Sequence, residues 1–277
     1  MRSLSAPRGP LRPTSGAVEV RRLVVLLPCL NEAEALPALL EQLAQLRTSL
    51  LPTDTAVEAL VVDDGSTDAT PDIAQQADAA GQGGLPVQLV QHPQNMGLGA
   101  ALLSGVQWFA AHCVDGDCLA AMDADGTHPP ELLHDMLARL DAGAEVVIAS
   151  RYAPGGSEHG LSPRRKLYSH GASWLLGLAA RVPGVRDYSC GYRLYSHAVI
   201  ARGLARYGDR LVSERSFVCM AELLCKLGAV RARIAEAPLE LHYELKAGAS
   251  KMNVPVTIRR YVALVGRLLF TREFRRE

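Results

Sequence analysis

The sequence predicts an α/β fold in which a mostly parallel sheet is flanked by helices on both faces. A short apolar run, a polar loop and an amphipathic stretch follow one another three times before Asp123, and this alternation is typical of parallel sheets. With 277 residues, of which 48% are hydrophobic, the chain can bury a full core. Because ligands bind such sheets at the carboxyl ends of the strands, we expect the polar loops to share one functional edge.

The first repeat begins with the apolar run Leu23 to Leu27, which predicts a strand. The loop Pro28 to Glu32 follows, and the next helix carries its apolar residues on one face, namely Leu36, Leu39, Leu40, Leu43 and Leu46. The run follows Arg21 and Arg22 as a signal-peptide core would, but it lacks a small-residue cleavage site and passes directly into the loop. Residues 1–20, which contain arginines among prolines, glycines and serines, are expected to form a disordered leader.

Two more repeats follow the first. Their elements are, in order, a strand Val57 to Val62, a polar turn Asp63 to Asp68, a helix opened by Thr70 and Pro71, a strand Val87 to Val90, a loop His92 to Gly99 and a helix Ala100 to Ala111. Gly97 and Gly99 raise the alternative of a nicotinamide dinucleotide site. That alternative fails, because the fingerprint GxGxxG belongs to the first strand-to-helix turn, which has no glycine here, and Leu102 stands where the third glycine is needed.

The fourth apolar run, Cys118 to Met122, ends in two carboxylates, Asp123 and Asp125. Pro129 and Pro130 then suit the first turn of another helix. Two carboxylates at the end of a strand can share one hard divalent cation, Mg2+ or Mn2+, which keeps open positions for the oxygens of a diphosphate. The alternative is a turn in which the two aspartates cap the helix or face solvent.

A possible phosphate site follows the fifth strand, Glu145 to Ala149. The helix that begins at Pro163 is basic at its start and apolar in its body. Arg165 and Ser169 lie four residues apart on one face near its N-terminus, a placement that favours an anion. The alternative is a solvated basic turn.

The C-terminal part combines short elements with one long helix. The expected elements are a turn Asp187 to Arg193 leading into a strand, a helix near Phe217 to Leu227, a strand near Ala229 to Ile234 and a basic loop Tyr243 to Lys251. The final helix, Val254 to Thr271, alternates apolar residues with arginines, which fits a basic amphipathic helix on a membrane surface. Packing against its own domain is the alternative. No stretch approaches the roughly 20 apolar residues of a membrane-spanning helix.

Charge and cysteine content narrow the class of protein. With 29 basic and 29 acidic residues, the chain has no net charge that would attract nucleic acid, so we expect no nucleic-acid partner. The six cysteines form no CxxC pair and fall mostly in apolar segments, which favours buried, reduced thiols. We therefore expect a cytoplasmic protein that is peripheral on the cytoplasmic membrane face.

Five motifs, in order, resemble the family 2 glycosyltransferases of GT-A fold. They are Pro28-x-x-Asn31-Glu32, Val61-Val62-Asp63-Asp64-Gly65-Ser66-x-Asp68-x-Thr70, Asn95-x-Gly97-x-Gly99-Ala100, Asp123-Ala124-Asp125-x-x-His128-Pro129-Pro130-Glu131 and Ser150-Arg151-Tyr152. The similarity runs from about Leu23 to Tyr261. Further stretches resemble the dolichol-phosphate mannose synthase and polyprenyl-phosphate glycosyltransferase group: Arg165-Lys166-Leu167-x-Ser169-x-Gly171-Ala172, Asp187-x-x-Cys190-Gly191-Tyr192 and Gly248-x-Ser250-Lys251.

The resemblance implies a Rossmann-like, mostly parallel sheet flanked by helices, with a C-terminal helical extension on the acceptor side. It places the GT-A domain at residues 21–243, a mobile active-site loop at 244–253 and the amphipathic helix at 254–277. It also implies an inverting, metal-dependent transfer of a hexose, with GDP-mannose favoured as donor, to a polyprenyl or dolichyl phosphate. A lipid phosphate is already largely ionised near neutral pH, because its second pKa is about 6, so no general base is needed.

Individual roles follow from the same resemblance. The nucleotide pocket would be formed by Pro28, Asn31, Glu32, Asp63, Asp64 and Asp123. Asp123 and the catalytic Asp125 would hold Mg2+ or Mn2+, and the third ligand would be Thr127, a water or none, since the family often has Gln at this position. The acceptor phosphate would be held by Arg151, Arg165 and Ser169. Lys246 would be the basic residue of the mobile loop, although it lies one place from the usual position, and Leu30 stands where an aromatic residue is common.

Two other functions stay open at this point. One is a glycosyltransferase that uses a sugar or other hydroxyl, for which Asp187 is the candidate base. The other is a non-catalytic protein that binds nucleotide sugars. For the favoured function the partners would be a nucleotide-sugar donor, a polyprenyl phosphate, a membrane surface and, as a further possibility, a membrane protein that presents the lipid.

Overall fold

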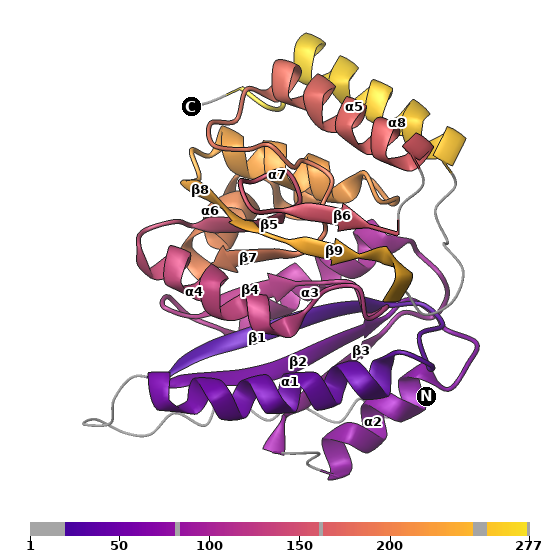
Figure 1. Ribbon diagram of the computed structural model, residues 1–277, viewed down its shortest axis with the longest axis vertical. Coiled ribbons are helices and arrows are strands. Elements are labelled where there is room, and N and C mark those ends of the chain that lie inside the picture. Colours follow the sequence, from indigo (N-terminus) through magenta and orange to yellow (C-terminus); the bar gives the residue numbers. More distant parts are fainter. Residues whose placement is uncertain (1–19, 81–83, 161–162, 246–253, 276–277) are drawn as a thin grey trace.

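The computed structural model describes residues 20–80, 84–160, 163–245 and 254–275 (Figure 1). A seven-stranded sheet runs through the molecule in the order β3-β2-β1-β4-β7-β5-β8. The strands are β1 Arg21–Cys29, β2 Thr55–Asp63, β3 Val87–Gln91, β4 Cys118–Ala121, β5 Val146–Ser150, β7 Arg193–Ser196 and β8 Ile234–Pro238. The strand pairs are parallel except where β7 lies antiparallel between β4 and β5. The predicted mostly parallel α/β sheet is confirmed.

Helices cover both faces of this sheet. The helices are α1 Leu36–Leu50, α2 Thr70–Ala80, α3 Leu98–His112, α4 Leu133–Asp141, α6 His197–Tyr207 and α7 Cys219–Ala229. Helices α1, α2 and α4 lie on the near face in Figure 1, and α3, α6 and α7 pack together on the other. Strands β1, β4 and β5 are almost entirely buried, as their continuous apolar sequence requires when both faces are covered.

Two helices stand apart from this layered core. Helices α5 Pro163–Ala180 and α8 Val254–Phe270 pack against each other and lie side by side at the top of Figure 1. Below them, β6 Ser157–His159 and β9 Glu240–His242 form a separate two-stranded parallel sheet. Within the described residues, no helix is both long and apolar enough to cross a bilayer.

The structure corrects three details of the predicted elements. Strand β8 begins at Ile234, where the predicted strand ended, because α7 continues to Ala229 and Arg231 then adopts a left-handed turn conformation with φ of 59°. Helix α6 and the short strands β6 and β9 were not predicted. All six cysteines are buried free thiols, as expected, and burial raises the pKa of Cys113 and Cys118 to about 12.

Candidate active site

The carboxyl ends of β1, β2 and β4 meet at one edge of the sheet. The register pairs Cys29 with Asp63, so the loops after β1 and β2 start at the same level. It pairs Leu26 with Ala121, so the loop after β4 starts three residues earlier along the same edge. They line one end of a cleft of about 950 Å3, and residues from α5 and α8 line the other end. Of the predicted nucleotide-pocket residues, Pro28, Glu32, Asp64 and Asp123 line this cleft.

Asn31 joins the first two loops. Its backbone has φ of 53°, a left-handed conformation that Asn tolerates better than most residues. Its side-chain oxygen accepts the backbone N–H of Thr67 at 2.8 Å, and its own N–H donates to Ser66 Oγ at 2.8 Å. The described contacts of Asn31 therefore brace the two loops against each other beside the cleft.

The two aspartates at the end of β2 are engaged in local structure. Asp63 Oδ1 accepts the Ser66 N–H at 3.2 Å. Asp64 Oδ1 accepts the His92 ring N–H at 2.7 Å, and Asp64 Oδ2 accepts the Gly97 N–H at 2.8 Å. Asp64 thus lines the cleft while it holds the glycine loop that precedes α3.

Glycine is required at two positions of that loop. Gly97 has φ of 97°, and a Cβ there would come within 2.6 Å of the Arg215 carbonyl oxygen. A Cβ on Gly99 would lie 1.7 Å from the Glu214 carbonyl oxygen. These glycines therefore let segment 213–216 pack directly on the loop rather than serving a dinucleotide fingerprint.

The loop after β4 presents Asp123 and Asp125 to the cleft. Asp125 Oδ1 accepts both the backbone N–H of Thr127 at 3.1 Å and its hydroxyl at 2.7 Å. The backbone N–H of Asp123 donates to His128 Nδ1 at 3.0 Å. The His128 ring stacks on Tyr192 with centroids 5.0 Å apart, which fixes the orientation of the acceptor nitrogen. The structure thus joins Asp123 to His128 and Asp125 to Thr127 within one loop.

This loop suits a hard divalent cation. Both carboxylates line the same cleft, and Gly191 lies beside the first of them, since a Cβ there would be in van der Waals contact with Asp123 Oδ1 at 3.4 Å. Among the described residues, no group of three or more His, Cys, Asp or Glu side chains gathers to hold a metal. A site with two protein carboxylates leaves the remaining positions for phosphate oxygens and water, as Mg2+ commonly requires.

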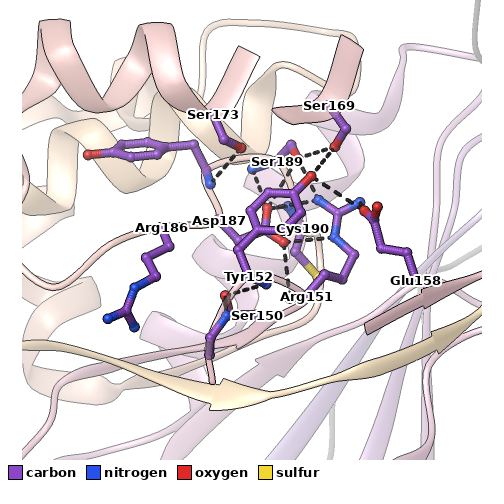
Figure 2. A network of polar contacts seen from close by, with 12 residues as sticks. Ser150, Arg151, Tyr152, Glu158, Ser169, Ser173, Arg186, Asp187, Ser189 and Cys190 are labelled. Atoms are coloured by element: carbon purple, nitrogen blue, oxygen red, sulfur yellow. Dashed lines mark hydrogen bonds and ion pairs between the residues drawn. The ribbon is translucent and has the colours of Figure 1, made fainter. Parts of the chain in front are cut away.

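Arg151 is held by two carboxylates (Figure 2). Its Nε lies 2.7 Å from Asp187 Oδ2, and its Nη2 donates to Asp187 Oδ1 at 2.8 Å and to Ser189 Oγ at 2.7 Å. Its Nη1 lies 3.2 Å from Glu158 Oε1. The arginine is therefore placed at the cleft but is already engaged on most of its N–H groups.

Three hydroxyls continue this polar network along the cleft. Tyr152 donates its phenol to Ser169 Oγ at 2.8 Å, and Ser169 Oγ lies 3.2 Å from Ser189 Oγ. Arg151, Ser169 and Ser189 all line the cleft. Arg151 and Ser169 thus belong to one polar network, linked through Ser189, and their role toward an anion stays a prediction. The Arg165 side chain and Lys246 lie outside the described part of the structure.

Comparison with known proteins decides the family. The family described as "Glycosyl transferase family 2" matches residues 24–204. This chain belongs to glycosyl transferase family 2. It is 35% identical to a polyprenol monophosphomannose synthase of Mycolicibacterium smegmatis over 237 residues, which cover 84% of this chain and 82% of that protein. It is 30% identical to an undecaprenyl-phosphate mannosyltransferase of Micrococcus luteus over 236 residues, which cover 84% and 88%.

Solved structures support the fold of this glycosyltransferase. A glucosyl-3-phosphoglycerate synthase from Mycobacterium tuberculosis, crystallised with Mn2+, uridine diphosphate and phosphoglyceric acid, aligns with a TM-score of 0.60 at 21% identity. That alignment covers 90% of this chain and 78% of the other. A mannosyl-3-phosphoglycerate synthase from Rubrobacter xylanophilus aligns with a TM-score of 0.58 at 17% identity over 90% and 73% of the two chains. The predicted GT-A-like architecture is thereby confirmed.

The end of the glycosyltransferase cleft between α5 and α8 is apolar. Its lining includes Leu175 of α5, Phe217, and Val254, Ile258, Tyr261, Val262 and Val265 of α8. Several of these side chains are also open to solvent, with exposed fractions of 45% for Leu175 and 61% for Val262. The cleft therefore runs without interruption from the carboxylates of the β4 loop to an apolar wall.

Sequence reasoning missed several residues of this site. His128 stood in a quoted motif but had no assigned role, and Ser189 fell within the predicted turn without one. Glu158 gave no signal, because it lies in a three-residue strand too short to show alternation. Asp187, proposed as a base for a hydroxyl acceptor, is fully buried against Arg151, which speaks against that role.

Proposed function

We propose that this glycosyltransferase transfers mannose from GDP-mannose to the phosphate of a polyprenyl phosphate, with inversion, at a membrane surface. The observation that carries the proposal is the single cleft that joins the Asp123 and Asp125 carboxylates, the Arg151 and Ser169 network and the apolar wall of α5 and α8. These three parts match the three parts of the reaction, namely a sugar diphosphate, a phosphate and a hydrocarbon chain. The two mannosyltransferase relatives support the same choice.

On the donor side, Asp123 and Asp125 would hold Mg2+ or Mn2+. When bound, the metal offsets the negative charge that grows on the diphosphate as it leaves. The chain supplies the fixed frame, because His128 and Thr127 tie down the loop that carries both carboxylates. Asp64 orders the neighbouring glycine loop in the same way.

On the acceptor side, Arg151, Ser169 and the helix start that carries Arg165 would hold the acceptor phosphate. The attacking oxygen belongs to a phosphate that is already ionised near neutral pH, so the site needs no proton acceptor. This fits the surroundings of Asp187, the only carboxylate suggested as a base. Its two oxygens accept hydrogen bonds from Arg151 and from the backbone N–H groups of Ser189 and Cys190.

The lipid chain would lie along the apolar wall and continue into a bilayer. Helix α8 exposes Val262, Leu269 and Phe270 to 61%, 58% and 87%, and α5 exposes Trp174 to 65%. These side chains lie on the two adjacent helices that flank the apolar end of the cleft. An acceptor anchored in the membrane could then reach the cleft without leaving the bilayer.

A comparison of acceptors tests the proposal. Wild-type protein with GDP-mannose and Mn2+ is offered a polyprenyl phosphate or the polyprenol of the same chain length. We expect transfer to the phosphate alone, and equal transfer to the alcohol would revive the hydroxyl-acceptor alternative. Thermal shifts with GDP-mannose, UDP-glucose and UDP-GlcNAc identify the donor, because a ligand that binds only the native state raises the melting temperature.

A variant of the metal site separates an enzyme from a binding protein. Asp125→Asn keeps the shape of the side chain but removes one charge from the carboxylate pair, so both Mn2+ affinity and turnover should fall sharply. Calorimetric titration of Mn2+ in the presence of GDP gives the affinity directly. Unchanged turnover at low Mn2+ would show that Asp125 does not hold the metal.

A further inference from the structure

The Glu158 side chain is buried although it lies on a short surface strand. Ser157 and Glu158 of β6 are half-buried as whole residues and His159 is exposed, but the Glu158 side chain taken alone is only 5% exposed. Its Oε1 lies 3.2 Å from Arg151 Nη1 and 3.4 Å from the Tyr152 hydroxyl oxygen, and its Oε2 lies 3.5 Å from His170 Nε2. Figure 2 shows Glu158 beside the Arg151 guanidinium, on the side opposite Asp187.

The position of Glu158 matters because most of the Arg151 N–H groups already have partners. A guanidinium carries five N–H groups. The Nε–H and one Nη2–H go to Asp187, and the other Nη2–H goes to Ser189 Oγ. The two N–H groups of Nη1 remain for a ligand in the cleft, and Glu158 Oε1 lies 3.2 Å from that nitrogen.

The charges at this point oppose an incoming anion. Arg151 contributes one positive charge, while Asp187 and Glu158 contribute one negative charge each. A phosphate monoester carries between one and two negative charges near neutral pH. Two negative groups that share one desolvated guanidinium repel each other, and burial strengthens the repulsion. Asp187 also accepts three hydrogen bonds from Ser189 and Cys190, which fix it within its own turn, whereas Glu158 approaches Arg151 from a separate strand.

The place of Glu158 in the fold permits its carboxylate to move away from Arg151. Strand β6 has three residues and pairs with β9 in a two-stranded sheet, separate from the seven-stranded one. By contrast, Arg151 follows directly on β5, which is buried along its whole length. The Glu158 carboxylate is therefore carried by a smaller and less buried part of the fold than the Arg151 guanidinium.

We propose that Glu158 is an internal competitor for the acceptor phosphate: its carboxylate occupies Arg151 Nη1 until the phosphate displaces it. This inference rests on the proposed function, because it assumes that Arg151 receives the acceptor phosphate. The competition lowers the binding affinity of every phosphate by the same factor. A small soluble phosphate has only its head group to offset that loss, whereas a lipid phosphate also buries its chain against α5 and α8. Glu158 thus leaves the ratio of the two affinities unchanged, but it lowers occupancy of the site by soluble phosphates, whose affinity has no contribution from a chain.

The substitution Glu158→Gln tests this directly. It keeps the size of the side chain and its ability to accept hydrogen bonds but removes the charge. Binding of inorganic phosphate and of farnesyl phosphate is measured by calorimetry on protein loaded with GDP and Mn2+. We expect both dissociation constants to fall by a common factor of roughly 3 to 30, the range of one exposed to half-buried charge interaction. Glu158→Ala, which also frees Nη1 sterically, should give at least the same gain.

The matched control is Glu240→Gln. Glu240 is an exposed carboxylate on β9 that pairs in register with Ser157, next to Glu158 in the chain. It removes the same charge from the same small sheet without touching Arg151, so phosphate binding should stay at the wild-type value.

Other outcomes overturn the inference in distinguishable ways. Weaker phosphate binding by both Glu158 variants would mean that Glu158 positions Arg151 for the ligand instead of competing with it. Unchanged phosphate binding would mean that Glu158 takes no part in it, without contradicting the assignment of the acceptor site. Failure of wild type and variants alike to bind farnesyl phosphate, with GDP and Mn2+ still bound, would remove the acceptor assignment itself and the inference with it.

Discussion

Asp187 binds Arg151 at two points, with its Oδ2 2.7 Å from Nε and its Oδ1 2.8 Å from Nη2. Burial of the Asp187 carboxyl would by itself raise its pKa, but the Arg151 charge and hydrogen bonds from Cys190 and Ser189 outweigh burial and lower the pKa. The same ion pair holds the pKa of Arg151 well above its usual value. A carboxylate with both oxygens engaged and a lowered pKa is a poor proton acceptor, so the pair is structural.

Asp187→Asn should destabilise the protein strongly. The change leaves the Arg151 guanidinium buried without its main counter-ion, and such a loss costs roughly 3 to 5 kcal/mol. Urea unfolding followed by circular dichroism measures the free energy. Asp135→Asn is the control, because Asp135 pairs with Arg139 on an exposed helix surface and its loss should cost less than about 0.5 kcal/mol. Equal effects of the two substitutions would contradict the structural importance of the Asp187 pair.

The same pair predicts how stability depends on pH. The Asp187 pKa is lower in the folded protein than the value of about 4 in an unfolded chain. Its contribution is therefore complete above about pH 4 and is lost as the pH falls through the folded-state pKa. Wild type should lose free energy of unfolding between pH 4 and pH 3 more steeply than Asp187→Asn. Parallel curves for the two proteins over this interval would show that the aspartate does not titrate as argued.

His128 should matter for metal binding through one nitrogen. Its Nδ1 accepts the Asp123 N–H and so fixes the loop that presents the first carboxylate. An Asn side-chain oxygen can replace Nδ1, whereas an Ala cannot accept a hydrogen bond. His128→Asn should keep Mn2+ affinity within about threefold, while His128→Ala should weaken it by roughly three- to tenfold, the worth of one hydrogen bond. Calorimetry with Mn2+ and GDP measures both, and equal losses would assign the histidine a packing role.

Much of the fold could be predicted from the sequence, because the central strands are buried and the main helices are amphipathic. The runs at Leu23 to Leu27 and Val57 to Val62 lie inside β1 and β2, and the leucines expected on one face of α1 are buried. The short elements were not predicted. Strands β6 and β9 have three residues each, and their pairing joins segments about 80 residues apart.

The sequence indicated which residues would line the candidate site, but not which of them contact one another there. The carboxylates after β1, β2 and β4 could be placed at one sheet edge, because parallel strands end together. Partners could not be predicted in the same way. Arg151 and Asp187 come from different loops, and nothing in either loop indicates that the arginine meets this carboxylate. Two of the three arginines of α8 give a second case, since Arg260 pairs with Glu214, and Arg267 pairs with Glu222 and Glu273, while Arg259 is exposed.

The pairing of these arginines changes the expected membrane behaviour. With Arg260 and Arg267 engaged in ion pairs, binding to lipid should depend mainly on the exposed apolar side chains of α8. Val262→Ser combined with Phe270→Ser should move the protein from anionic liposomes to the supernatant in a sedimentation assay, and added salt should have a smaller effect. Leu51→Ser, which changes a leucine of similar exposure before β2, is the control. Unaltered sedimentation of the double variant would exclude α8 as the contact.

Deletion of the helix would not test this claim. The buried Lys226 ammonium lies 3.0 Å from both Glu222 and Glu273, and Arg267 also contacts Glu222. Removal of the helix and the residues after it would leave a buried lysine and glutamate without two of their partners. Loss of folded protein is therefore the expected result of deletion, whatever the helix does at a membrane.

Arg165 and Ser169 should determine acceptor binding without affecting the donor. Ser169 lies at the centre of the hydroxyl network between Tyr152 and Ser189, and Arg165 precedes it by one turn of α5. Arg165→Ala should weaken use of a polyprenyl phosphate by roughly 1.5 to 3 kcal/mol, the worth of a charged hydrogen bond, or about tenfold to a hundredfold. Ser169→Ala removes a neutral hydrogen bond and should cost roughly 0.5 to 1.5 kcal/mol.

The decisive measurement is the acceptor KM beside the GDP-mannose affinity of the same variants. Arg165→Lys should recover only part of the loss, because a point charge cannot reproduce the paired hydrogen bonds of a guanidinium. The donor affinity should stay at the wild-type value, since both residues belong to α5 and neither is part of the loops after β1, β2 and β4 that would hold the donor. If Arg165→Ala leaves the acceptor KM unchanged while Ser169→Ala raises it, the phosphate is held by the hydroxyl network and Arg151 rather than by the start of α5.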